Sequence, residues 1–173
     1  MSSAISLIAL NAKSPDEFVR ILGGVFEHSP WVAENVAIQR PFQSVDALHQ
    51  AMVSAIEAAG PEAQLTLICA HPELAGKAAI GGQLTIESTA EQSGAGLDNC
   101  TPEQFSTLTS LNQAYREKFG FPFILAVRGY DRAGIIEQFK RRLSLTVEAE
   151  KAESLEQIYK IGRLRLNDLV GED

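Results

Sequence analysis

The chain has 173 residues, 45% of them hydrophobic, and its formal net charge at pH 7 is −7. This length suits one domain, expected to cover residues 1–173, and the apolar content is sufficient for a hydrophobic core. The acidic balance argues against a nucleic-acid-binding protein, because such proteins present a basic face to phosphates. The first ten residues lack a basic region and a long apolar stretch, so we expect no signal peptide, no membrane span and a cytoplasmic location.

No metal or organic cofactor is expected from sequence motifs. The chain has no GxGxxG, Walker A, HExxH or GxSxG pattern and no EF-hand loop. It has only three histidines, and its two cysteines, Cys69 and Cys100, do not form a CxxC pair. Any catalysis would therefore depend on side chains and backbone groups alone.

Helix signals dominate the first seventy residues. Ser14-Pro15-Asp16-Glu17 is a capping box with proline at the first helical position, and Ser44 is an N-cap before a run with helical apolar spacing. Residues 65–70 look buried on most sides. Four helices are predicted here, bounded by Ser14 and Gly23, Pro30 and Pro41, Val45 and Ala59, and Pro61 and His71.

The remainder of the chain contains two segments that do not fit a helix. Residues 71–100 are rich in glycine and small polar residues, which predicts a long loop with one short helix starting at Ser88. The apolar run 121–127 has no evident strand partner and is interpreted as a buried extended segment. Further helices are expected over residues 102–119, 132–143 and 147–170. The sequence thus predicts an all-α, single-domain bundle of about seven to nine helices.

Two ionisable residues near the long loop are candidates for chemistry. His71 precedes Pro72, which ends the helix and favours an extended backbone from which the imidazole could enter a cleft. From its spacing alone, a helix-end histidine stabilised by the helix dipole is the favoured interpretation. Glu91 completes a capping box with Ser88 and could serve only that purpose, although the start of a helix can also bind anions.

The last helix and the apolar run supply two further candidates. Arg165 falls on an apolar stripe, so its guanidinium must find an acceptor, either a buried carboxylate of the protein or a substrate anion. The backbone groups of residues 123–127 also need partners, which a planar amide-rich ligand or a neighbouring loop could supply.

Three blocks of sequence resemble the OHCU decarboxylase family, where OHCU is 2-oxo-4-hydroxy-4-carboxy-5-ureidoimidazoline. The resemblance extends from the first helix to Arg165, and one departure is Leu145, where family members often carry Asn. The blocks are Ala70-His71-Pro72-Glu73-Leu74-Ala75-Gly76-Lys77, the stretch Leu84 to Asp98 with Ser88, Glu91 and Gln92, and the stretch Leu111 to Val127 with Tyr115, Lys118 and Phe119-Gly120-Phe121-Pro122-Phe123.

The resemblance implies an all-helical, generally homodimeric enzyme without a cofactor that converts OHCU to (S)-allantoin and CO2, the last step from urate to allantoin. It implies that His71, Glu91 and Arg165 are the catalytic residues. The adjacent ring C=N of the substrate can accept electrons, so no pyridoxal or thiamine is required. The substrate-contacting positions that it implies are Pro72, Ser88, Thr89, Ala90, Gln92, Phe123, Ile124, Leu125, Ala126 and Val127.

Two alternatives remain open from the residues themselves. In a helical binding module without catalysis, His71, Glu91 and Arg165 would form a structural polar network. In a different lyase or hydrolase, the same pocket would act on another ureido compound. Stereospecific release of allantoin would separate the predicted decarboxylase from both.

Overall fold

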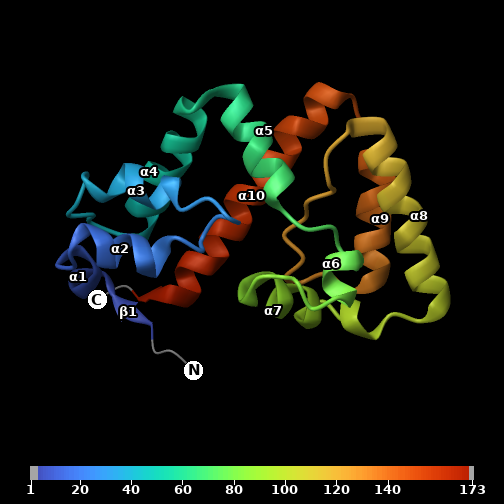
Figure 1. Ribbon diagram of the computed structural model, residues 1–173, viewed down its shortest axis with the longest axis horizontal. Helices are drawn as coiled ribbons and strands as arrows, with labels where there is room; N and C mark the ends of the chain where they lie inside the picture. Colours follow the sequence, from blue (N-terminus) through green and yellow to red (C-terminus); the bar gives the residue numbers. More distant parts are fainter. Residues whose placement is uncertain (1–3, 172–173) are drawn as a thin grey trace. The chain divides into compact units, whose positions relative to one another are not determined.

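The structure is a computed structural model that describes residues 4–171 (Figure 1). The chain forms two compact units. The first contains the residues up to Ala70 together with those from Tyr159 onward, and the second contains His71–Ile158. One long helix, α10 (Val147–Leu169), contributes its first part to the second unit and its last part to the first.

The first unit is built from short helices, most of which pack against the next helix in the chain. Helices α2, α3, α4 and α5 contact one another in chain order, and residues Ile5–Ser6 (β1) pair in parallel with Val170–Gly171 (β2). Fully buried Phe18, Leu48 and Met52 form part of its core. The helices are α1 (Leu7–Asn11), α2 (Pro15–Leu22), α3 (Trp31–Ala37), α4 (Val45–Ala58) and α5 (Gly60–Ala70).

Local capping explains where these helices begin. Ser14 forms the predicted capping box with Glu17, and the Ser44 hydroxyl accepts from the Ala47 N–H, so both predicted helix starts are confirmed. The expected burial of residues 65–70 on most sides is wrong, because Leu65 and Cys69 are exposed and only the middle of the stretch is buried.

The second unit contains α6 (Lys77–Ile80), α7 (Ile86–Gly94), a 3-10 turn (Leu97–Asn99), α8 (Pro102–Phe119) and α9 (Arg132–Leu143). Helices α8 and α9 lie side by side (Figure 1). The predicted single helix within residues 71–100 is therefore replaced by two helices and a 3-10 turn. The predicted start at Ser88 is also wrong, because Thr85 is the N-cap and its hydroxyl accepts from the Ser88 N–H.

The apolar run after α8 is neither helix nor strand, as predicted. Gly120 ends α8 with φ of 78°, which glycine adopts readily, and residues 121–125 and 127 are buried. Phe123 stacks on Phe139 with ring centroids 3.7 Å apart, and Tyr115 meets Phe123 edge to face. Aromatic packing therefore fixes this extended run against α8 and α9.

The all-α class is confirmed. Within residues 4–171 there are ten α-helices, and setting aside the short α1 and α6 leaves eight, inside the predicted range. None of the helices in this part of the chain combines the length and the apolar character needed to cross a lipid bilayer.

Candidate active site

His71 is the first residue after α5 and the first of the second unit. Only 7% of it is exposed, whereas Pro72 is half-buried. As predicted, the chain leaves the helix at this point. His71 is therefore withdrawn from solvent at the point where the chain turns away from α5.

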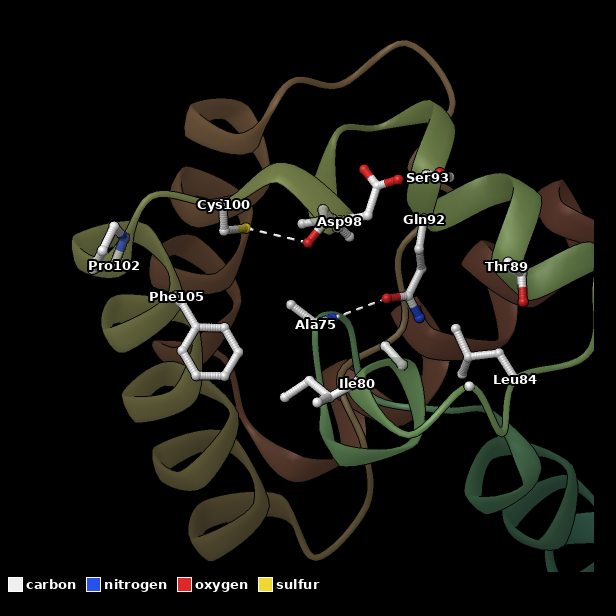
Figure 2. A pocket seen from close by; sticks show the side chains of 13 residues that line it. Ala75, Ile80, Leu84, Thr89, Gln92, Ser93, Asp98, Cys100, Pro102 and Phe105 are labelled. Atoms are coloured by element: carbon white, nitrogen blue, oxygen red, sulfur yellow. Dashed lines mark hydrogen bonds between the residues drawn. The ribbon is translucent and has the colours of Figure 1, made fainter.

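The segment that follows His71 is held by one side chain of α7, that of Gln92. The Gln92 amide forms two hydrogen bonds with this segment. Its Oε1 accepts from the Ala75 N–H at 2.9 Å (Figure 2), and its Nε2 donates to the Glu73 carbonyl at 3.2 Å. Ala75 has φ of 50°, a conformation that costs a non-glycine residue about 1 kcal/mol. The Gln92 amide therefore holds a tight and mildly strained turn just beyond His71.

Helix α8 fastens the same segment from another direction. The Asn112 Nδ2 donates to the Leu74 carbonyl at 2.9 Å, and the Arg116 guanidinium pairs with the Glu73 carboxylate at 2.7 Å. Gly76 completes the turn, because a Cβ there would lie 2.8 Å from that of Glu73. The position of the chain after His71 is thus set by two helices and does not depend on the loop alone.

Helix α7 carries Glu91 beside the residue that holds this turn. Ser88, Glu91 and Gln92 lie at helical spacing on one face, where Ser88 and Gln92 are buried and Glu91 is half-buried. Thr89 and Ala90 are exposed. Because the helix begins at Ile86, Glu91 lies too far along it to cap its start, which removes the predicted capping-box alternative.

Arg165 belongs to the first unit and is 4% exposed. Its Nη1 donates to the Glu27 carboxylate at 2.8 Å and to the Gly24 carbonyl at 3.2 Å. Of the two predicted kinds of acceptor, the structure supplies the buried carboxylate, since the Glu27 side chain is 1% exposed. Arg163, two residues earlier, pairs with Asp46 and remains partly exposed.

The residue before Glu27 also contacts α10. A Cβ at Gly162 would lie 2.7 Å from the ring of Phe26, which is itself buried. Phe26 and Glu27 thus meet α10 at positions 162 and 165, one turn of helix apart. The apolar stripe predicted for the last helix is confirmed at these positions and at fully buried Ile158.

Side chains from α9 and α10 take up backbone groups of residues 123–127. The Arg142 Nη1 donates to the Ile124 carbonyl, and the Gln157 Oε1 accepts from the Ala126 N–H at 3.0 Å. Arg142 is fully buried and forms an ion pair with the equally buried Glu150. Two of the backbone groups that were predicted to need partners therefore find them within the protein.

A cavity of about 500 Å³ lies in the second unit, between α6, α7 and the beginning of α8 (Figure 2). Apolar side chains such as Ile80, Leu84 and Phe105 line it, and of the predicted contact residues it includes Thr89 and Gln92. The residues that line it do not include His71 or Glu91. This hollow and the predicted catalytic pair are therefore different places on the second unit.

The polar groups around the cavity are largely engaged with the protein. The Ser93 hydroxyl donates to Asp98, and the Cys100 thiol donates to the Leu97 carbonyl. Burial raises the pKa of the Cys100 thiol, so the thiol does not form a ready nucleophile. In the part of the chain that the structure describes, no three His, Cys, Asp or Glu side chains are grouped closely enough to hold a metal ion.

The sequence interpretation missed several buried polar residues around these sites, among them Glu27, Asn112, Arg142 and Gln157. Arg142 could have been found, since Ile135, Phe139 and Arg142 recur at helical spacing on the buried face of α9. The same spacing identified Arg165. Glu27 gives no comparable signal, because it lies in a turn rather than on a periodic face.

Comparison with known proteins places the chain in a family. Residues 11–167 match the family model described as OHCU decarboxylase. The chain is 40% identical over 162 residues to a 2-oxo-4-hydroxy-4-carboxy-5-ureidoimidazoline decarboxylase of Haloferax volcanii, a match covering 94% of each protein. It is 38% identical over 167 residues to the protein of that name from Mus musculus, covering 96% of this chain and 94% of the other.

A solved structure agrees with these matches. The crystal structure of an (S)-allantoin synthase superposes with a TM-score of 0.79 at 29% identity. The match covers 96% of this chain and 54% of that one, so this chain spans about half of that protein's length. From the family match over residues 11–167 and the full-length relatives, the chain belongs to the OHCU decarboxylase family.

Proposed function

We propose that this protein decarboxylates OHCU and releases (S)-allantoin and CO2, as a cofactor-independent carboxy-lyase in urate degradation. The observation that carries the proposal is the match to named decarboxylases at 40% and 38% identity over nearly the whole of both chains. The family model also spans His71, Glu91 and Arg165 within residues 11–167.

The reaction needs one bond broken and one proton delivered. The bond between the ring carbon and its carboxylate breaks, CO2 leaves, and the electron pair moves toward the adjacent C=N. The ring nitrogen takes up a proton, a second proton adds to the neighbouring carbon, and the hydroxyl loses its proton as the carbon that carried the carboxylate becomes the carbonyl of allantoin, so that one proton is consumed overall. The enzyme must hold the ring, favour loss of CO2 and supply the proton to one face only.

His71 is the general acid and base in this proposal. Its support is the buried position at the end of α5 and the turn beyond it, which Gln92 and Asn112 hold through backbone groups. Rigid support of this kind is what a proton donor needs, because proton transfer depends on geometry as well as on pKa. Glu91, next to Gln92 on α7, orients the imidazole or bonds the substrate hydroxyl.

Arg165 and the backbone of residues 123–127 bind the substrate in the same proposal. A guanidinium is suited to a carboxylate or carbonyl group, and backbone N–H and C=O groups are suited to the ureido and ring amides. Pro72, Ser88, Thr89 and Ala90 keep their predicted role as contact positions.

The test compares two histidine variants. In His71→Asn we expect the turnover rate to fall by about 10²- to 10⁴-fold, the usual contribution of a general acid or base. The substrate is generated from urate with the two upstream enzymes, and allantoin is followed by its optical activity. His28→Asn is the matched control, because His28 is exposed and has φ of 48°, which asparagine tolerates.

The outcomes separate the alternatives. Stereospecific allantoin from the wild type and His28→Asn, with slow racemic product from His71→Asn, supports the proposal. Unchanged turnover in folded His71→Asn removes the role of His71. A wild-type protein that leaves the spontaneous rate unchanged would point instead to a binding module or to another ureido substrate.

Two expectations about the protein in solution are also proposals. We propose a homodimer, because the resembled family is generally dimeric, and light scattering coupled to size-exclusion chromatography measures its mass. We also propose a cytoplasmic location, to which the two free cysteines are suited. Cell fractionation tests that location.

A further inference from the structure

The geometry points to Gln157 and Arg142 as positioning residues that fix the backbone of residues 123–127 and thereby the face of the substrate that receives the proton. This inference rests on the proposed function insofar as that backbone contacts the substrate. The anchoring itself is a property of the second unit and can be measured without substrate.

Gln157 lies on α10 and is only 6% exposed. Its Oε1 accepts from the Ala126 N–H at 3.0 Å, and its Nε2 donates to the Glu153 carboxylate at 3.0 Å. An ionised carboxylate can only accept, so Glu153 requires the NH2 end of the amide and leaves the oxygen for Ala126. The orientation of the Gln157 side chain is therefore fixed from both sides.

Arg142 holds the carbonyl two residues before Ala126. Its Nη1 donates to the Ile124 carbonyl, while its Nε donates to Glu150 at 2.7 Å and its Nη2 to the Ser154 hydroxyl at 3.2 Å. The guanidinium also lies over the Phe123 ring, 4.4 Å from its centroid. Because these contacts approach from several directions, the guanidinium has little freedom to turn away from Ile124.

The two anchored groups are two residues apart, which is the repeat of an extended backbone. In such a backbone, Ile124 and Ala126 direct their N–H and C=O groups to one side and Leu125 directs its own to the other. Fastening the first side to α9 and α10 therefore sets the direction of the Leu125 peptide groups. A substrate that forms hydrogen bonds with the Leu125 N–H and C=O would be held at a fixed angle to its proton donor.

The test uses Gln157→Met, which keeps a long side chain but removes the acceptor for Ala126. Hydrogen exchange over residues 121–128, without substrate, should become about tenfold faster, because the amide loses its partner. With OHCU we expect kcat to fall about tenfold, KM to change less, and the enantiomeric excess of allantoin to drop.

Gln113→Met is the matched control. Gln113 on α8 also donates to a glutamate one helical turn away, Glu117, at 2.9 Å, but it is exposed. It should leave exchange, kcat and enantiomeric excess at wild-type values. Gln157→Ala is measured alongside as a second variant. Its smaller side chain lets water bond the Ala126 N–H, so the protein can fold even though the acceptor on residue 157 is gone.

The inference is overturned if folded Gln157→Met or Gln157→Ala exchanges residues 121–128 at the wild-type rate. It is also overturned if exchange accelerates while kcat and enantiomeric excess stay unchanged. An inactive wild-type protein would refute the proposed decarboxylase instead, and the exchange experiment would still report on the anchoring.

Discussion

Each of the two units contains a buried arginine paired with a buried glutamate, and the two pairs are built differently. Arg142 and Glu150 are eight residues apart, and both side chains are 0% exposed. Arg165 and Glu27 are 138 residues apart, with side chains 4% and 1% exposed. The first pair joins neighbouring helices, whereas the second ties α10 to a turn near the start of the chain.

The surroundings of the pairs differ further. Glu150 also accepts from the Tyr115 hydroxyl, and Arg142 also donates to Ser154 and to the Ile124 carbonyl. This network holds a backbone segment in place. The protein should lose more stability when one member of this pair is removed, because each remaining partner is then buried without its hydrogen bond.

Removing each arginine tests this contrast and should give the largest effects. We expect Arg142→Met to lower the free energy of unfolding by about 4–5 kcal/mol, and Arg165→Met by about 3 kcal/mol, since each leaves an uncompensated buried carboxylate. Urea denaturation at pH 7 measures both.

Arg163→Met is the control on the same helix as Arg165. Its partner Asp46 is 68% exposed, so the loss should stay below about 1 kcal/mol. Equal losses for Arg163→Met and Arg165→Met, or a greater loss for Arg165→Met than for Arg142→Met, would contradict the ranking.

Alkaline pH should affect the Arg142 cluster through Tyr115. Burial, followed by the Glu150 hydrogen bond and charge, raises the pKa of Tyr115 above its usual value. A raised folded-state pKa stabilises the protein fully below the unfolded value, about 10, and this contribution is lost as pH rises above it. Tyr115→Phe should cost about 2 kcal/mol at pH 7.

The difference between wild type and Tyr115→Phe should then shrink by up to about 1.4 kcal/mol per pH unit above 10. Urea titrations from pH 8 to 11 measure it. A difference that stays constant throughout this range would show that the Tyr115 hydroxyl does not couple folding to proton binding.

Acidic pH should affect the first unit through His49, with the smallest effect. Burial lowers the pKa of His49, with a further contribution from Arg163, against the opposing effects of the Tyr159 carbonyl and Asp46. The unfolded chain then binds a proton that the folded chain resists, so stability falls as pH drops below about 6.5. His49→Asn should remove that part of the pH dependence between pH 7 and 5.

A parallel wild-type curve, measured by thermal unfolding in the same buffers, provides the reference. Identical slopes for the two proteins would contradict the assignment to His49. With different slopes, the two titrations would show that the stability contribution of His49 in the first unit is lost in acid and that of Tyr115 in the second unit is lost in alkali.

The two arginines also show what sequence reasoning can reach. Arg165 was predicted to need an acceptor, either a buried carboxylate or a substrate anion, because it interrupts an apolar stripe. Arg142 was missed because it ends the charged run Lys140-Arg141-Arg142. In both cases helical spacing marks the buried face. The identity of the partner was beyond reach, since Glu27 is brought to Arg165 by tertiary packing rather than by local pattern.

Helix boundaries were predicted well where a single capping residue was available. Ser14 and Ser44 each start a helix as expected, because capping depends on neighbouring residues only. The start of α7 was misplaced because Thr85 and Ser88 are both good caps three residues apart. The buried segment 121–127 was recognised, but the side chains that hold it come from helices later in the chain.

The contact between Phe26 and Gly162 has a consequence for how such sequences can diverge. Because no Cβ fits at position 162 beside the intact ring, a larger residue there would require a smaller one at position 26. The neighbouring Glu27 and Arg165 would have to be exchanged together as well, to keep the buried charges balanced. Positions 26 and 162 should therefore covary among related sequences, and so should positions 27 and 165. Both pairs depend on how far the last helix is shifted along its axis relative to the turn that carries Phe26 and Glu27.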